Sequence, residues 1–244
     1  MSKRFLNYAA CLFIMAIFLA GCGGGAGDST TQDDNDDFGG VISQPPSSSS
    51  GAPGGVWVDS SGNLRIQATL YDGAGNPITT GNVQGSIWVG PGTPDVMLGT
   101  AAEVNPQGAF NLTIPIPASQ YRFALNTEMV DEFGNPFPNV TITNGHVAVT
   151  SIDVTYSTNG SSSTIKLSPW PLSTTDKVEY SYYYATGSAS VVGTAEEKGD
   201  VFTVDMQLVS GWNSFWAVID SNNNYFLISQ QPPSNVRWVY STNP

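Results

Sequence analysis

Residues 64–70, Leu64-Arg65-Ile66-Gln67-Ala68-Thr69-Leu70, alternate between apolar and polar side chains with a period of two. Because successive side chains of a β-strand point to opposite faces of a sheet, this alternation predicts a strand with one buried face. The segment Asp72-Gly73-Ala74-Gly75-Asn76-Pro77 follows directly and consists of residues that tight turns favour. A short alternating strand that ends in such a turn is typical of an antiparallel sheet.

The same pattern continues toward the C-terminal end of the chain. Further strands are predicted at residues 86–89, 109–114, 146–156, 178–184, 202–208, 212–219, 225–228 and 236–240. Turn-forming residues separate these segments about every 8–12 residues, and none of the segments has the 3.6-residue apolar period of an amphipathic helix. The chain from residue 56 onward is therefore expected to be all-β and antiparallel, with a sandwich architecture.

A polar interruption divides this β-rich part in two. The segment Asn159-Gly160-Ser161-Ser162-Ser163 contains no apolar side chain and is interpreted as a linker. The prediction is a first β-sandwich module at residues 56–158 and a second, aromatic-rich β module at residues 159–244. Each part is long enough to bury a small core of its own. A single larger sandwich is the alternative.

Two stretches of the first module resemble the carboxypeptidase regulatory-like and transthyretin-like β-sandwich families. In the first, from Leu70 to Ile78, a strand ends in a Gly-Asn-Pro turn. In the second, from Gly99 to Leu112, a polar turn with glycine leads into a strand. The resemblance implies one or two small Ig-like or transthyretin-like modules with a non-catalytic accessory role. Residues 116–138, with their additional prolines, depart from the family pattern.

The N-terminus has the three parts of a secretory signal. Lys3 and Arg4 form a basic start, and a short apolar stretch and a pair of small residues follow. The apolar stretch is interrupted by Asn7 and is short for a membrane-spanning helix, which needs about 20 apolar residues. Residues 1–21 are therefore predicted to be an export signal that is absent from the mature chain.

The end of this signal, Leu19-Ala20-Gly21-Cys22, resembles the lipobox of bacterial lipoproteins. The resemblance implies that a signal peptidase cuts between Gly21 and Cys22 and that the Cys22 thiol carries a diacylglyceryl group. Such chains anchor a protein stably, because each buried methylene adds about 0.8 kcal/mol. Gly23, rather than aspartate, follows the cysteine, which by analogy with enteric lipoproteins implies the outer membrane in a Gram-negative host. The alternative is an ordinary signal peptide with a chance cysteine.

Residues 22–55 have the composition of a disordered tether between the lipid and the fold. They contain the acidic run Asp33-Asp34-Asn35-Asp36-Asp37, the pair Pro45-Pro46 and a run of serines, without any apolar period. The acidic run does not match a calcium-binding EF-hand loop, since Phe38 and Gln44 stand where that loop has glycine and glutamate. As a flexible coil the tether would extend roughly 30–35 Å.

Charge and cysteine content exclude several functional classes. The formal net charge is −12, which argues against nucleic-acid binding because phosphates require a basic face. Of the two cysteines, Cys11 lies in the predicted signal, so the mature chain keeps Cys22 alone. An internal disulfide and a cysteine metal site are therefore impossible in the mature chain, and neither a metal nor a cofactor is predicted.

Residues that catalysis would require are few. The single histidine, His146, lies in a strand-like run, and no Gly-x-Ser-x-Gly motif supplies a nucleophile. Acidic residues that could pair as in a glycosidase fall into two groups, which are Glu128, Asp131 and Glu132, and Glu179, Glu196, Glu197 and Asp200. Surface solvation explains both groups, so no catalytic residue is predicted. An unrecognised carboxylate-based hydrolase is kept as an alternative.

The aromatic residues have two interpretations. All six tryptophans follow residue 55, and Trp212 and Trp216 are spaced to share one face of a strand. In the strand at 178–184, Tyr183 points away from the face that the other tyrosines share. Core packing is the expected role of these rings. The alternative is an exposed ligand platform of Trp212, Trp216 and Tyr183 that stacks on sugars.

These observations predict a lipid-anchored protein of the bacterial cell envelope with a non-catalytic structural or protein-interaction role. Its expected partners are the membrane, through the lipid on Cys22, and other envelope proteins or glycans. One alternative is a carbohydrate-binding surface lipoprotein that uses exposed aromatic rings. The other is the carboxylate-based hydrolase.

Overall fold

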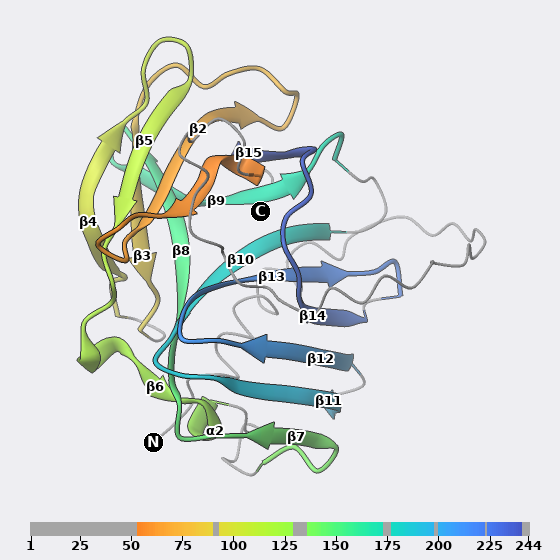
Figure 1. Ribbon diagram of the computed structural model, residues 1–244. Helices are drawn as coiled ribbons and strands as arrows, with labels where there is room; N and C mark the ends of the chain where they lie inside the picture. Colours follow the sequence, from red (N-terminus) through yellow and green to blue (C-terminus); the bar gives the residue numbers. More distant parts are fainter. Residues whose placement is uncertain are drawn as a thin grey trace.

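The computed structural model describes residues 53–89, 93–128, 136–172, 177–197, 200–222 and 224–240. Within these residues the chain is all-β, as predicted, and most strand pairs are antiparallel (Figure 1). Helical structure in this part is limited to the single turn α2 (Leu125–Glu128) and the 3-10 turns η2 (Pro53–Gly55) and η3 (Ser119–Tyr121). The predicted export signal, the lipobox and the tether up to residue 52 lie outside the described residues.

The strands, in chain order, are β1 (Val56–Val58), β2 (Leu64–Asp72), β3 (Asn82–Ile87), β4 (Val96–Glu103), β5 (Ala109–Ile114), β6 (Phe123–Ala124), β7 (Val140–Thr143), β8 (Ala148–Thr158), β9 (Ser161–Pro169), β10 (Lys177–Ala185), β11 (Ala189–Glu197), β12 (Asp200–Leu208), β13 (Gly211–Ile219), β14 (Tyr225–Ser229) and β15 (Val236–Tyr240). The bounds of β5 and β15 are those predicted. Strands β1, β4, β6, β7, β9 and β11 were not predicted as separate segments. His146 lies exposed in the turn before β8 rather than within a strand.

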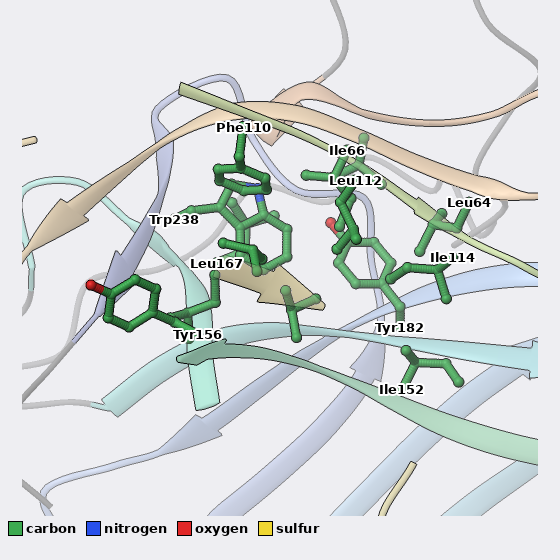
Figure 2. Close-up of a cluster of buried hydrophobic side chains, with 14 of the residues drawn as sticks. Leu64, Ile66, Phe110, Leu112, Ile114, Ile152, Tyr156, Leu167, Tyr182 and Trp238 are labelled. Atoms are coloured by element: carbon green, nitrogen blue, oxygen red, sulfur yellow. The ribbon is translucent and has the colours of Figure 1, made fainter. Parts of the chain in front are cut away.

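A curved sheet encloses the first core. Its strands follow the order β4-β3-β8-β9-β15-β2-β5, with β1 also paired to β2, and β2 and β15 run parallel. The sheet curls so that β3 and β4 contact β5. As the alternation in the sequence predicts, Leu64, Ile66 and Leu70 of β2 are fully buried on the inner face. Figure 2 shows this core, in which Tyr182 and Trp238 pack with aliphatic side chains of β2 and β5.

A second core lies against the sheet β8-β10-β13-β14-β12-β11-β7. In this sheet β13 and β14 form an antiparallel pair, whereas β12 and β14 run parallel. Val204, Met206 and Leu208 of β12 are buried together in this core, as their spacing predicts. Leu125 of α2 is fully buried in the same cluster.

Strands β10 and β13 lie between the two cores. Tyr180, Tyr182 and Trp212 belong to the first core, whereas Tyr183 and Phe215 belong to the second. This division follows from the alternation of side chains along a strand. The prediction that Tyr183 points away from the face of its tyrosine neighbours is therefore confirmed.

The predicted linker at residues 159–163 has a regular structure. Thr158 pairs with Ser161, so that Asn159 and Gly160 form a two-residue turn between β8 and β9. Both have a positive φ, 48° and 82°, as the twist of a tight hairpin requires. The division into two modules at residue 158/159 remains a prediction, and strands from both sides of this boundary pair with one another, since β15 lies beside β2.

Four loops share one hydrogen-bond pattern. In each, a side-chain oxygen accepts hydrogen bonds from the backbone N–H groups two and four residues later, and the four acceptors are Asp59, Asp72, Asn105 and Asp220. Such a local bond holds the backbone in the turn. The Asp220 loop lies in the connection between the paired strands β13 and β14.

Candidate functional site

The outer face of the curved sheet carries the most distinctive group of polar and aromatic side chains. In β15, Val236 and Trp238 point into the first core, so Arg237 points to the opposite, outer face. Arg237 pairs with Ser168 of β9, and Val239 pairs with Tyr71 of β2. Because paired residues point to the same side, the outer side chains of β2, β15 and β9 lie next to one another.

Arg237 lies between two aromatic rings. Its guanidinium carbon is 4.7 Å from the ring centroid of Tyr71 and 4.6 Å from that of Trp170. Tyr71 comes from β2 and Trp170 directly follows β9, and these strands flank β15 on its two sides. All three side chains are half-buried. A cation within about 6 Å of a ring centroid is attracted by the ring's quadrupole, and partial burial strengthens this attraction.

Trp170 is fixed by hydrogen bonds to Asn235 and by the packing of its ring against Gly75. Its backbone N–H donates to the carbonyl oxygen of Asn235 at 2.7 Å, and its own carbonyl oxygen accepts from Asn235 Nδ2 at 3.4 Å. Its ring lies against Gly75, where a Cβ atom would be 2.7 Å from Cζ2 of the indole. Gly75 belongs to the loop that Asp72 organises. The backbone N–H and the side-chain amide of Asn76 lower the pKa of Asp72, so this carboxylate is ionised at neutral pH.

A shallow pocket of about 290 Å³ lies beside Arg237. We call it the Arg237 pocket, and its lining consists of Gly54, Gly55, Gln67, Ala68, Thr69, Tyr71, Val236, Arg237 and Trp238. Trp238 Nε1 donates to the carbonyl oxygen of Gly54 at 2.9 Å and fixes the η2 turn against β15. Gly55 has no room for a side chain, because a Cβ atom would be 2.0 Å from the carbonyl oxygen of Gln67. Pro53–Gly55, which we predicted as the end of the tether, is thus part of the fold.

The pocket lining can bind but lacks a conventional acid–base pair. It offers the Arg237 guanidinium, the amide of Gln67, the hydroxyl of Thr69 and the phenol of Tyr71, and it includes no carboxylate and no histidine. Among the described residues, Arg237 forms no ion pair. In the same part of the chain no group of three or more acidic, histidine or cysteine side chains could hold a metal ion, and no helix has the length and apolar character to span a membrane.

A charged cluster lies further along the same outer face. Lys166 of β9 pairs with Val239, and its Nζ lies 3.0 Å from Oε1 of Glu179 in β10. Asp153 of β8 is close by. Burial raises the pKa of Asp153, the Lys166 ammonium opposes the rise, and the negative charge of Glu179 adds to it. The structure thus brings Glu179, one of the predicted acidic candidates, beside an aspartate that the sequence did not single out.

The three rings of the predicted ligand platform are not brought together on one exposed surface. Trp212 is 3% exposed, and its Nε1 donates to the carbonyl oxygen of Gly62 at 2.8 Å. Tyr183 is 5% exposed and packs edge-on against Phe215 in the second core. Trp216 is half-buried and packs against the first core. Their positions agree with the core-packing interpretation. Cys22 and Gly21 lie outside the described residues.

The sequence did not indicate Tyr71, Trp170 or Arg237 as site residues. The alternation of β15 does place Arg237 opposite its buried neighbours. The two rings that flank it, however, come from distant segments, and only the strand order β2-β15-β9 brings them together.

Comparisons with protein families, with curated proteins and with solved structures found no match for this chain. The resemblances to the bacterial lipobox and to the carboxypeptidase regulatory-like sandwiches therefore remain predictions.

Proposed function

We propose that this chain is a lipid-anchored protein of the bacterial cell envelope whose folded part has a non-catalytic interaction role. The anchoring part of the proposal rests on Leu19-Ala20-Gly21-Cys22 and on the polar segment that follows it. The single observation that carries the interaction role is the Arg237 pocket, an open cavity whose lining includes a guanidinium group that lies over the rings of Tyr71 and Trp170. Small-molecule sites of this kind combine apolar surface with a few oriented polar groups.

The composition of the pocket favours binding over catalysis. General acid–base chemistry needs a titratable group near neutral pH within reach of the substrate. The lining residues include no carboxylate and no histidine. The charged cluster of Asp153, Lys166 and Glu179 supports a hydrolase less well than the pocket supports binding. Lys166 is already paired with Glu179 and serves as its structural counter-ion.

A carbohydrate-binding surface lipoprotein is the second candidate, and a specific observation favours it. Tyr71 is half-buried and lines an open pocket with polar groups, and the half-buried Trp170 lies beside Arg237, which lines the same pocket. Aromatic rings with one apolar face and nearby hydrogen-bonding groups suit the amphipathic surface of a sugar. In this candidate the platform consists of Tyr71 and Trp170 rather than Trp212, Trp216 and Tyr183.

The test uses the whole chain, purified in detergent, on an array of bacterial envelope glycans and peptides. We expect retention of intact ligands by the parent protein, with reduced retention by Trp170→Leu. The control is Arg122→Gln, since Arg122 also lies over a ring, that of Tyr184 at 5.0 Å, but outside the Arg237 pocket. If the parent protein instead releases shortened glycans during incubation and Glu179→Gln does not, the hydrolase alternative would replace the binding role.

A further inference from the structure

The geometry around Arg237 determines where a ligand can approach. A guanidinium group has five N–H donors in one plane and no acceptor. Tyr71 and Trp170, from the strands on either side of β15, cover its flanks at 4.7 and 4.6 Å. Because Arg237 also lines the pocket, N–H donors that do not face a ring can meet an acceptor there. The two ring contacts also restrict the side chain, which reduces the entropy lost when a ligand binds.

We propose that the Arg237 pocket binds a carboxylate-bearing sugar of about one residue in size, such as a uronate. A planar carboxylate matches the edge of a guanidinium through two parallel hydrogen bonds. The pocket volume of about 290 Å³ lies at the lower end of small-molecule sites and suits a single ring. Gln67 and Thr69 line the same cavity and supply hydrogen-bonding groups for sugar hydroxyls. This inference rests on the proposed binding role and names its ligand.

The charge of the site selects among anions. Arg237 is the one cation in the pocket lining, and the chain as a whole carries a formal charge of −12. A single guanidinium can neutralise one carboxylate. A phosphate group, with a second negative charge, would keep an uncompensated charge in the field of an acidic protein. The absence of a carboxylate from the lining means that an acidic ligand meets no direct repulsion within the pocket itself.

The experiment measures binding to the whole chain, purified in detergent, by isothermal titration calorimetry at low salt. The probes are glucuronate, acetate, glucose and inorganic phosphate. We expect glucuronate to bind at least about tenfold more tightly than each of the other three, because it alone combines the carboxylate with the sugar ring. Raising the salt concentration should weaken glucuronate binding, since the contact is electrostatic.

Two variants of Arg237 test the planar geometry of its guanidinium group separately from its positive charge. Arg237→Gln should weaken glucuronate binding at least about tenfold. Arg237→Lys keeps the charge but loses the planar fork, and it should weaken binding to a comparable extent. Arg122→Gln, whose wild-type Nε donates to the carbonyl oxygen of Pro117 at 2.7 Å, should leave binding unchanged. Thermal melting of each variant confirms that it is folded, and a folded Arg237→Lys suffices if Arg237→Gln does not fold.

Three results would overturn the inference. These are no binding of glucuronate to the parent protein, binding of glucuronate by a folded Arg237 variant as tight as by the parent, or binding of phosphate, acetate or glucose as tight as that of glucuronate. Its failure is distinguishable from failure of the proposed function. Retention of neutral glycans or peptides on the array, together with no glucuronate binding, would refute the carboxylate ligand alone.

Discussion

The indole Nε1 of Trp238 donates a hydrogen bond of 2.9 Å to the carbonyl oxygen of Gly54, a residue 184 positions earlier in the chain. This bond joins β15 to the first described residues. Both Gly54 and Trp238 line the Arg237 pocket. The segment that leads from the predicted lipid anchor therefore enters the fold beside the candidate binding site.

Trp212 tests the core-packing interpretation of the aromatic residues. Because the side chain is buried and its Nε1 is bonded to Gly62, we expect Trp212→Ala to lower the free energy of unfolding by about 3–5 kcal/mol. Trp216→Ala, at a half-buried position, should cost less. Chemical denaturation measures both. A Trp212→Ala variant as stable as the parent would contradict the burial of this ring.

Tyr182 offers a substitution that should stabilise the fold. Its ring packs in the first core, stacked at 6.3 Å from Trp238, but its hydroxyl has no hydrogen-bond partner among the described residues. A buried donor without a partner costs about 1–3 kcal/mol, so Tyr182→Phe should raise the free energy of unfolding by about 1 kcal/mol.

Tyr156→Phe is the matched control for Tyr182→Phe. The Tyr156 hydroxyl donates to the carbonyl oxygen of Thr80 at 2.9 Å, so the same change there should destabilise the protein by about 1 kcal/mol. Equal effects of the two variants in denaturant titrations would contradict the finding that the Tyr182 hydroxyl has no hydrogen-bond partner among the described residues.

Asp72 should make its loop sensitive to acid. Hydrogen bonds from Asn76 lower the pKa of Asp72 below the ordinary value of 3.8. A carboxyl with a lower pKa in the folded state contributes stability above its unfolded pKa, and that contribution is lost as the pH falls through the folded value. We expect the amide NMR signals of Ala74 and Asn76 to shift in that range below pH 3.8.

The control for this titration is Asp72→Asn, which keeps an acceptor oxygen but cannot ionise. In this variant the two amide signals should be insensitive to pH over the same range. An equal shift in both proteins would assign the titration to another group.

The pairing between the two halves of the chain predicts that neither half is stable alone. Strand β15 pairs with β2 across the boundary at residue 158/159, and Tyr182 and Trp212 complete the first core. A fragment of residues 56–158 would expose that core to water. We expect it to show little cooperative unfolding in circular dichroism, whereas a cooperative transition like that of the whole chain would support two separate modules.

The sequence was sufficient to predict the all-β class and the strands whose burial follows the period of two. Leu64, Ile66 and Leu70 illustrate this relationship, as does the division between Tyr183 and its neighbours. Strand β9 was missed because its first residues, Ser161–Ser163, have the composition of a linker, although they pair with β8 in a hairpin. Local composition does not reveal such pairing.

The candidate site was beyond prediction for a related reason. Tyr71, Arg237 and Trp170 become neighbours only because β15 lies between β2 and β9, an arrangement set by long-range packing. Trp212 and Trp216, which the sequence offered for the alternative ligand platform, have a regular spacing on one strand. That spacing is equally typical of core packing, and both rings pack with the first core.

Labelling with radioactive palmitate, combined with fractionation of the cells, shows whether Cys22 carries a lipid anchor. We expect the parent protein to be labelled and to sediment with the membrane, and Cys22→Ser to lose both the label and the membrane association. A Cys22→Ser protein that still incorporates palmitate and remains in the membrane fraction would contradict it.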